Sequence, residues 1–149
     1  MLEGALVILP LMALGFALLD FALAIFIQNT LRNAVREGVR YAITQQTGAS
    51  GQDAAITGVV EQNSMGFLNS SSLGGSQPTA TIAIQYYNPT TLTSVSGTGS
   101  NAAGNICVVT ATIQHGWMVP LWRGTGVLTF NASSSDLMEP PPNGVLPTR

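Results

Sequence analysis

The sequence predicts an α+β protein in which a long N-terminal hydrophobic helix is joined to a small head with a second helix and a three- or four-stranded antiparallel sheet. Three observations support this prediction: an almost uncharged apolar run at the start, helical periodicity that continues beyond it, and apolar residues at alternate positions in three later segments. A chain of 149 residues holds one hydrophobic span and one domain of about 100 residues. We divide it into an apolar membrane or fibre-core segment (1–27), an amphipathic continuation of the helix (28–47), a head (48–139) and a proline-rich tail (140–149).

The first element is the apolar run "MLEGALVILPLMALGFALLDFALAIFIQ", whose only charged residues are Glu3 and Asp20. Its first 27 residues would form a helix about 40 Å long, more than the hydrocarbon core of a bilayer, about 30 Å. It is too long for a signal peptide and lacks a basic start and a clear cleavage site, so we expect it to be retained. No basic residue precedes it, which indicates a mature chain that has lost a basic leader.

The helix is expected to continue as one element from near Met1 to about Gln46. Beyond the apolar run, one stripe of the helix is apolar or small and a different face is basic. Pro10 is either tolerated in the first turns or kinks the helix. The stripe comprises Leu31, Ala34, Val35, Gly38 and Ala42, and the basic face comprises Arg32, Arg36 and Arg40. Small residues that let helices approach closely, but are common in any membrane helix, are Gly4, Ala13, Gly15, Ala17 and Ala24.

The head is expected to begin with a second helix over 53–68, started by a capping box of Ser50 and Asp53. A loop then leads to the first strand, "TIAIQYY". The next segment is rich in serine, threonine, glycine and asparagine, which predicts an irregular surface loop. The remaining expected elements are strands at 106–114 and 126–133, the connection "HGWMVPLWRGT" between them, and the extended tail.

Composition excludes several classes of function. Only 8% of residues are charged and the net charge is −2, which gives no electrostatic footprint for nucleic acid and suggests that other copies cover much of the surface. The single cysteine, Cys107, is expected to be a buried, inert thiol. No second base or acidic cluster accompanies His115. Phosphate loops, metal-ligand spacings and nucleophile elbows are absent from the sequence, so we expect no enzyme, metal or cofactor.

The N-terminal 46 residues resemble the TadE-like family of tight-adherence (Flp) pilus systems, which are type IV pilin-like proteins. The matching motifs are Glu3 followed by "ALVILP", Asp20, and above all "LRNAVREGVRYA". More loosely, "GQDAAITGVV" and "VVTATIQHGWMVPLWRGTGVLTFNASSS" are similar to the family's later elements. The resemblance implies removal of a leader by a prepilin-type peptidase, insertion in the inner membrane, and other pilins or the assembly platform as partners. One departure is that Glu3 stands at position 3, whereas type IV pilins place a glutamate at the fifth mature position.

Two acidic residues are candidate assembly sites. The resemblance implies that Glu3 neutralises the amino terminus of an adjacent subunit; alternatively it lies at the edge of the lipid headgroups. Asp20 could pair with one of the basic-face arginines of a neighbour, or it stays protonated inside the membrane. Those arginines could instead form a solvated face in which Arg40 pairs locally with Glu37.

The aromatic residues Trp117 and Trp122 could form an adhesive surface patch or pack in the head core. Asn69 and Asn131 each begin a glycosylation pattern, which alone decides nothing. The leading hypothesis is a structural pilin that polymerises through its N-terminal helix into an extracellular filament. The alternatives are a minor pseudopilin that primes or caps fibres at the inner membrane, and a membrane-anchored module that binds a ligand through "HGWMVPLW".

Overall fold

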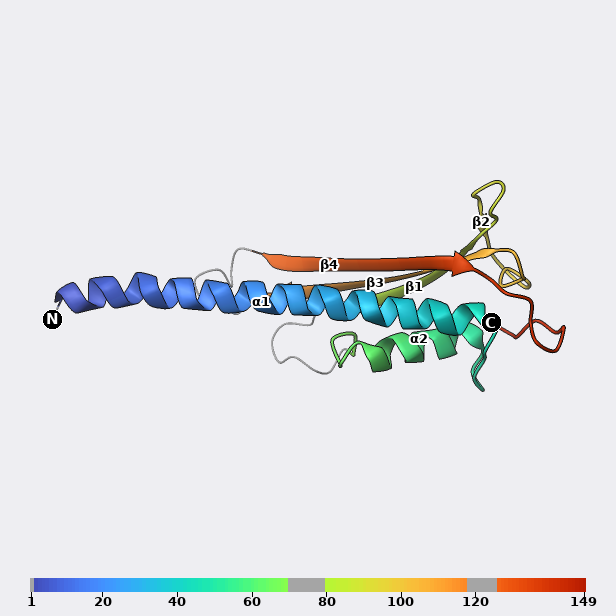
Figure 1. Ribbon diagram of the computed structural model, residues 1–149, viewed down its shortest axis with the longest axis horizontal. Coiled ribbons are helices and arrows are strands. Elements are labelled where there is room, and N and C mark those ends of the chain that lie inside the picture. The colour runs from blue at the N-terminus through green and yellow to red at the C-terminus, as the bar shows by residue number, and fades with distance from the viewer. Residues whose placement is uncertain (1, 70–79, 118–125) are drawn as a thin grey trace.

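The computed structural model describes residues 2–69, 80–117 and 126–149, with the side chains at positions 2, 3, 5 and 6 outside this description. A long helix is followed by a short helix and a four-stranded antiparallel sheet of order β2-β1-β3-β4 (Figure 1). This arrangement confirms the predicted α+β, pilin-like layout. The elements are α1 (Leu2–Ile43), α2 (Gln52–Asn63), β1 (Ala80–Tyr87), β2 (Ser94–Val95), β3 (Ile106–Gly116) and β4 (Val127–Leu137).

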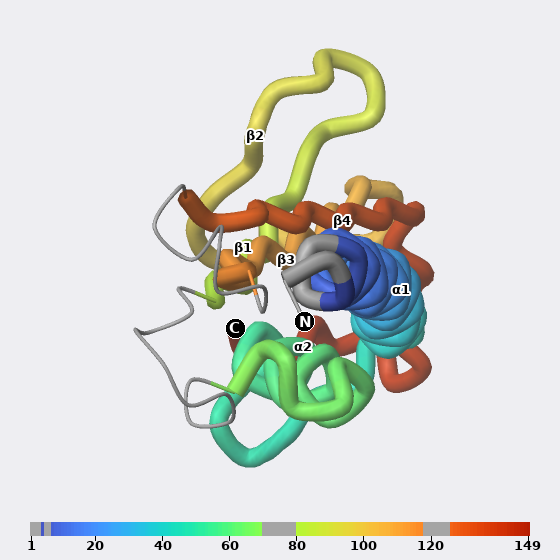
Figure 2. The backbone as a smooth tube through the Cα atoms, turned by 90° about the vertical axis from the view of Figure 1, so that its left-hand side faces the viewer, coloured from blue at the N-terminus to red at the C-terminus, as the bar shows by residue number. Residues whose placement is uncertain are grey.

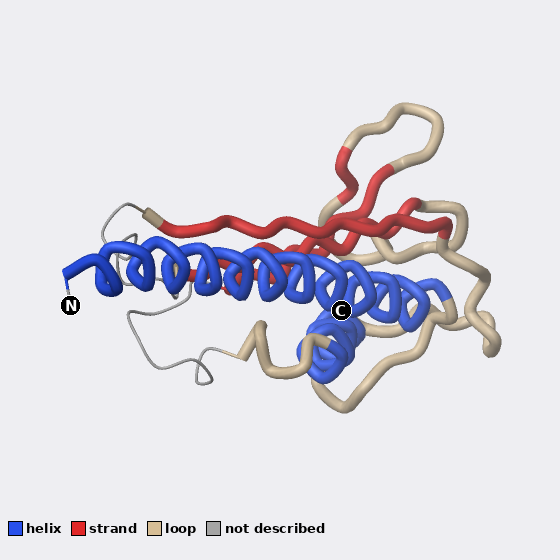
Figure 3. The backbone as a smooth tube through the Cα atoms, turned by 60° about the vertical axis from the view of Figure 1, so that its left-hand side comes forward, coloured by secondary structure: helices blue, strands red, loops and turns tan. Residues whose placement is uncertain are grey.

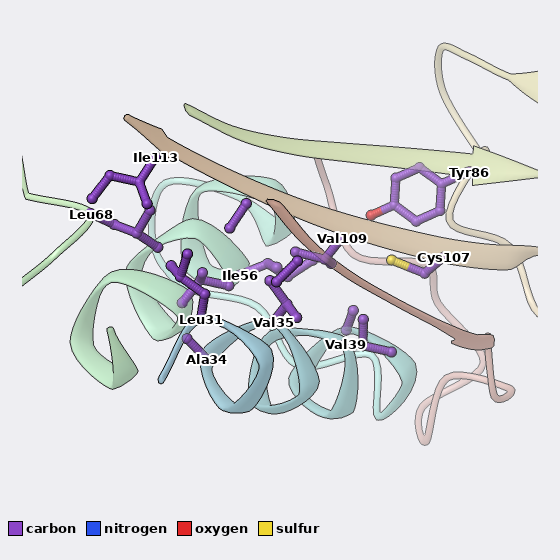
Figure 4. Close-up of a cluster of buried hydrophobic side chains, with 14 of the residues drawn as sticks. Leu31, Ala34, Val35, Val39, Ile56, Leu68, Tyr86, Cys107, Val109 and Ile113 are labelled. Atoms are coloured by element: carbon purple, nitrogen blue, oxygen red, sulfur yellow. The ribbon is translucent and has the colours of Figure 1, made fainter. Parts of the chain in front are cut away.

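The head has two layers, with both helices on the same side of the sheet (Figure 2). α1 contacts α2, β3 and β4. Side chains on β3 alternate between buried and half-buried because every second residue points to the helices. The core therefore joins alternate residues of the sheet to one stripe of α1 and one face of α2 (Figure 4). Its members include Leu31, Val35, Val39, Ile56, Val60, Cys107, Val109, Ala111 and Ile113.

Gly38 permits the close approach of the two helices. A Cβ atom at this position would overlap the Cγ2 methyl of Val60, which is fully buried, and would lie 3.7 Å from Cγ2 of Ile56. A residue without a Cβ is therefore required where α1 crosses α2 at this distance. The glycine stands in the sequence "REGVRYA", so part of that motif serves packing within the chain.

Several boundaries differ from the prediction: both helices end earlier, and β4 extends four residues further, to Leu137. α1 ends at Ile43, and Gln45, two residues later, adopts a positive φ of 57°. α2 ends at Asn63. The predicted capping box is wrong, because α2 is capped by Gly51 at φ 95° with no side-chain hydrogen bond. Asp53 is engaged elsewhere, as described below. The segment 88–104, expected as an irregular surface loop, contains β2 and the buried side chain of Asn101.

Buried amides connect this segment to the ends of both helices. Nε2 of Gln45 donates to the carbonyl oxygens of Asn101 at 2.9 Å and Glu139 at 3.0 Å. Nδ2 of Asn101 in turn donates to Oε1 of Gln52 at 2.6 Å. These groups are removed from water and hydrogen-bonded to one another, which fixes where α1 ends and α2 begins.

The proline-rich tail is not helical, as predicted, but it packs back onto the head. The backbone N–H of Gln52 donates to the carbonyl oxygen of Thr148 at 2.7 Å. Nδ2 of Asn101 donates to the carbonyl oxygen of Pro147 at 2.9 Å. The guanidinium of Arg149 forms an ion pair with Asp53 at 2.8 Å and lies 4.7 Å from the ring centroid of Tyr86. The Tyr86 hydroxyl donates to the same carboxylate at 2.9 Å. We call Asp53, Tyr86 and Arg149 the C-terminal cluster.

Replacement of Arg149 by alanine is expected to lower the free energy of unfolding by about 1 kcal/mol, because it removes a partly exposed ion pair and a cation–π contact. The measurement is urea unfolding of the detergent-solubilised chain. Arg36→Ala is the matched control, since Arg36 is exposed and forms no ion pair with a described residue. Equal unfolding curves for the two variants would show that the cluster does not stabilise the head.

Candidate assembly surface

The N-terminal part of α1 is an exposed apolar surface. It projects beyond the head, as Figure 1 shows, and nearly all of its described side chains are open to the surroundings. An apolar helix of this length and composition meets the criteria for a membrane span, from Val7 to Ile43. Large patches of this kind mark membrane or protein interaction sites. The large exposed side chains are Val7, Ile8, Leu9, Leu11, Met12, Leu14, Phe16, Leu18, Leu19, Phe21, Ile25 and Phe26.

The head begins beside the middle of α1. Nε2 of Gln28 donates to the backbone carbonyl oxygen of Asn131 at 3.0 Å. The backbone N–H of Glu139 donates to the carbonyl oxygen of Ile43 at 3.2 Å. α1 and β4 therefore run in the same direction, and the eight positions from Asn131 to Glu139 accompany the fifteen positions from Gln28 to Ile43. On this scale the first residue of β4, Val127, lies level with about residue 20 of the helix.

Asp20 lies at this boundary. Its side chain is 6% exposed, whereas Leu19 and Phe21 on either side are 63% and 67% exposed. Positions 20, 23, 27 and 31 recur at helical spacing, so Asp20 extends the stripe of Leu23, Ile27 and Leu31 that packs against the core. The carboxylate thus belongs to the side of α1 that faces its own head. The expected pairing of Asp20 with an arginine of a neighbouring subunit remains a prediction.

The other predicted helix residues have different settings. Pro10 lies within the continuous helix α1, so it is accommodated without ending the element. A Cβ atom at Gly4 or Gly15 would meet nothing within 4 Å, and Ala13 and Ala17 are half-buried. The open space at the two glycines is available to a neighbouring helix. The side chain of Glu3 lies outside the described residues, so its role also remains a prediction.

The basic face is exposed at the level of the head. Arg32, Arg36 and Arg40 are all exposed and form no ion pair with any residue within 2–69, 80–117 or 126–149. The local pair between Glu37 and Arg40 expected from the sequence does not form in this structure. These three arginines are the majority of the five basic residues in the chain. They are therefore available to another molecule.

A shallow groove lies where α1 meets β4. Ala24, Ile25 and Phe130 form its apolar wall, and Gln28, Asn29 and Arg32 line it as well. The groove runs from the apolar part of α1 toward the basic face. In Figure 3, α1 and the strands lie side by side at this level, and the N-terminal helix continues past them. The groove thus joins the apolar and basic surfaces of α1 into one continuous surface.

The head residues singled out from the sequence have different settings. Trp117 is half-buried at the end of β3, and Trp122 lies outside the described residues. His115 lies on the inner side of the sheet opposite Leu128, and no described metal-ligating cluster surrounds it.

Burial raises the pKa of Cys107 to about 12. Burial likewise raises the pKa of Tyr86, together with the neighbouring Cys107 and the hydrogen bond to Asp53.

Cys107 is therefore expected to resist alkylation in the folded protein. At pH 8 its thiol is protonated and inaccessible, so iodoacetamide should modify it only after unfolding. Because the folded pKa lies above the unfolded value, the stabilising effect of the protonated thiol is complete below about pH 8.5 and is lost as pH rises toward 12. Mass spectrometry after a timed iodoacetamide pulse measures this directly. Rapid native labelling would show that the strand is open at Cys107.

Comparisons with known proteins give a match for the N-terminal part of α1. Neither curated proteins nor solved structures gave a match. The family described as TadE-like protein matches residues 1–40, the segment in which the sequence resembles that family.

Proposed function

We propose that this protein is a pilin that is anchored in the inner membrane by the projecting part of α1 and then polymerises into an extracellular filament. The observation that carries the proposal is the row of exposed apolar side chains from Val7 to Leu19, which projects beyond the head. Among the described residues, the hydrophobic core includes no member of this row. The row requires lipid before assembly and other copies of the helix afterwards.

The length of the projecting helix supports membrane anchoring. Residues 2–19 extend about 27 Å, close to the hydrocarbon thickness of about 30 Å. With this segment in the bilayer, the head rests at the membrane surface, and Asp20 lies at the boundary instead of near the centre. An acidic residue at this depth avoids most of the cost of roughly 3 kcal/mol that applies at the centre.

Polymerisation is supported by the gain from covering this surface. Fully burying one leucine or isoleucine contributes about 1.5 to 3 kcal/mol, and a filament core could cover many of these side chains per subunit. The same helix that crosses the membrane can therefore leave it without exposing apolar surface to water. The low charge of the chain, 8% of residues, is consistent with a protein whose sides are covered by neighbours.

Electron microscopy of filaments sheared from cells, with mass spectrometry of their subunits, tests the proposal. We expect this chain to be the main component. A trace amount in filaments made of another pilin would favour the minor pseudopilin. A head that binds a ligand while no filament contains the chain would favour the membrane-anchored binding module.

A further inference from the structure

The back of α1 at the level of the head exposes both apolar and basic side chains. Phe21 and Ile25 are 67% and 48% exposed, although they lie beside or beyond the start of the head. Arg32 and Arg36 follow on the same open side of the helix. A partner that covers this surface must therefore present an apolar part followed by an acidic part.

Lipid does not meet this requirement. If the membrane boundary lies at Asp20, Arg32 is about 18 Å beyond it along the helix. The headgroup layer adds only about 6 Å on each side of the hydrocarbon core. An upright helix thus holds the arginine above the lipid phosphates, and the partner is a protein.

A second copy of this chain carries both complementary parts. Its projecting helix is apolar from Val7 to Leu19. At the far end of its head, Asp136 and Glu139 are exposed and form no ion pair with a described residue. From the contacts of β4 with α1, Asp136 lies level with about residue 37, and Glu139 lies beside Ile43.

We propose that neighbouring copies dock with an axial displacement of about 8 to 16 Å along α1. The outer copy is the one displaced toward the C-terminal end of α1 of the inner copy. This displacement brings Arg32 of the outer copy level with Asp136 and Glu139 of the inner copy. The same displacement places residues 10–20 of the outer copy beside Phe21 and Ile25 of the inner one. One axial displacement therefore covers the apolar side chains with apolar side chains and pairs Arg32 with acidic side chains. Contacts between different surfaces of identical subunits extend the assembly into a filament. This inference rests on the proposed polymerisation.

Disulfide cross-linking tests the displacement in full-length protein in membranes and in sheared filaments. In a Cys107→Ala background, Arg32→Cys combined with Glu139→Cys is expected to give a ladder of linked chains. Within one chain these positions are about 16 Å apart along the helix, too far for a disulfide. The control pair is Arg32→Cys with Thr90→Cys, because Thr90 is exposed in the loop before β2. An equal ladder from the control pair would overturn the inference.

Charge reversal provides the second test. Arg32→Glu or Glu139→Arg alone is expected to lower the yield of filaments about fivefold, and the double variant should restore most of it. Normal filaments with neither a ladder nor a charge effect would overturn the displacement and leave the proposed pilin intact. Absence of the wild-type chain from filaments would overturn the pilin and the inference together. Loss of binding to phosphatidylglycerol vesicles by Arg32→Glu, with unchanged filaments, would assign the arginine to lipid instead.

Discussion

Replacement of Leu14 by arginine is expected to lower the equilibrium constant for membrane insertion about a hundredfold, because a central arginine costs about 3 kcal/mol on insertion. The side chain is 65% exposed and lies in the part of α1 that projects past the head, so the head should remain folded. Membrane flotation of the full chain measures the first effect. Urea unfolding in detergent, followed by near-ultraviolet circular dichroism, measures the second.

Leu31→Ala provides the reciprocal variant on the same helix. Leu31 is fully buried in the head core, so its truncation should lower the free energy of unfolding by about 2 to 5 kcal/mol and leave membrane binding unchanged. Leu14→Ala should have little effect on unfolding, since its position touches no core residue. If Leu14→Arg unfolded the head or stayed fully in the membrane, the division of α1 into two functional halves would be wrong.

The second large effect is expected where α1 crosses α2. Gly38→Ala should lower the free energy of unfolding by about 1 to 3 kcal/mol, because the new methyl group would overlap Val60 in a closed core. Val60→Ala removes the overlapping methyl, so adding Gly38→Ala to that variant should cost much less. A double-mutant cycle by urea unfolding reports this coupling.

Gly58→Ala is the matched control for this cycle. Gly58 lies inside α2, and a Cβ atom there would meet nothing within 4 Å. Alanine should therefore stabilise the protein by about 0.5 to 1 kcal/mol through helix propensity. If Gly38→Ala were also neutral or stabilising, or if its cost were the same without the Val60 side chain, the close crossing of the helices would be refuted.

The sequence was sufficient to predict the elements that depend on periodicity. The alternation of Cys107, Val109, Ala111 and Ile113 correctly identified the inner side of β3, and the 3.6-residue period identified the buried stripe of α1. Such patterns are local, because each residue repeats the environment of another a few positions away. The helix can therefore be predicted from the sequence without knowledge of any tertiary contact.

Contacts between distant segments could not be predicted in this way. Asp53 fits a capping pattern locally, yet its carboxylate binds Arg149, which is 96 positions away. The buried amide of Asn101 stands in a segment whose composition is typical of surface loops. Similarly, the hydropathy of the first 27 residues gave no sign that the head starts beside Asp20, because a sequence window does not show which helix residues a strand will accompany.

The most direct measurement of the central claim is a cryo-electron microscopy map of the sheared filament. We predict that this chain forms the filament, with α1 at its centre and residues 7–26 covered by neighbouring copies. A filament built from another protein, or one in which α1 of this chain lies on the outside with its apolar side chains uncovered, would contradict the account.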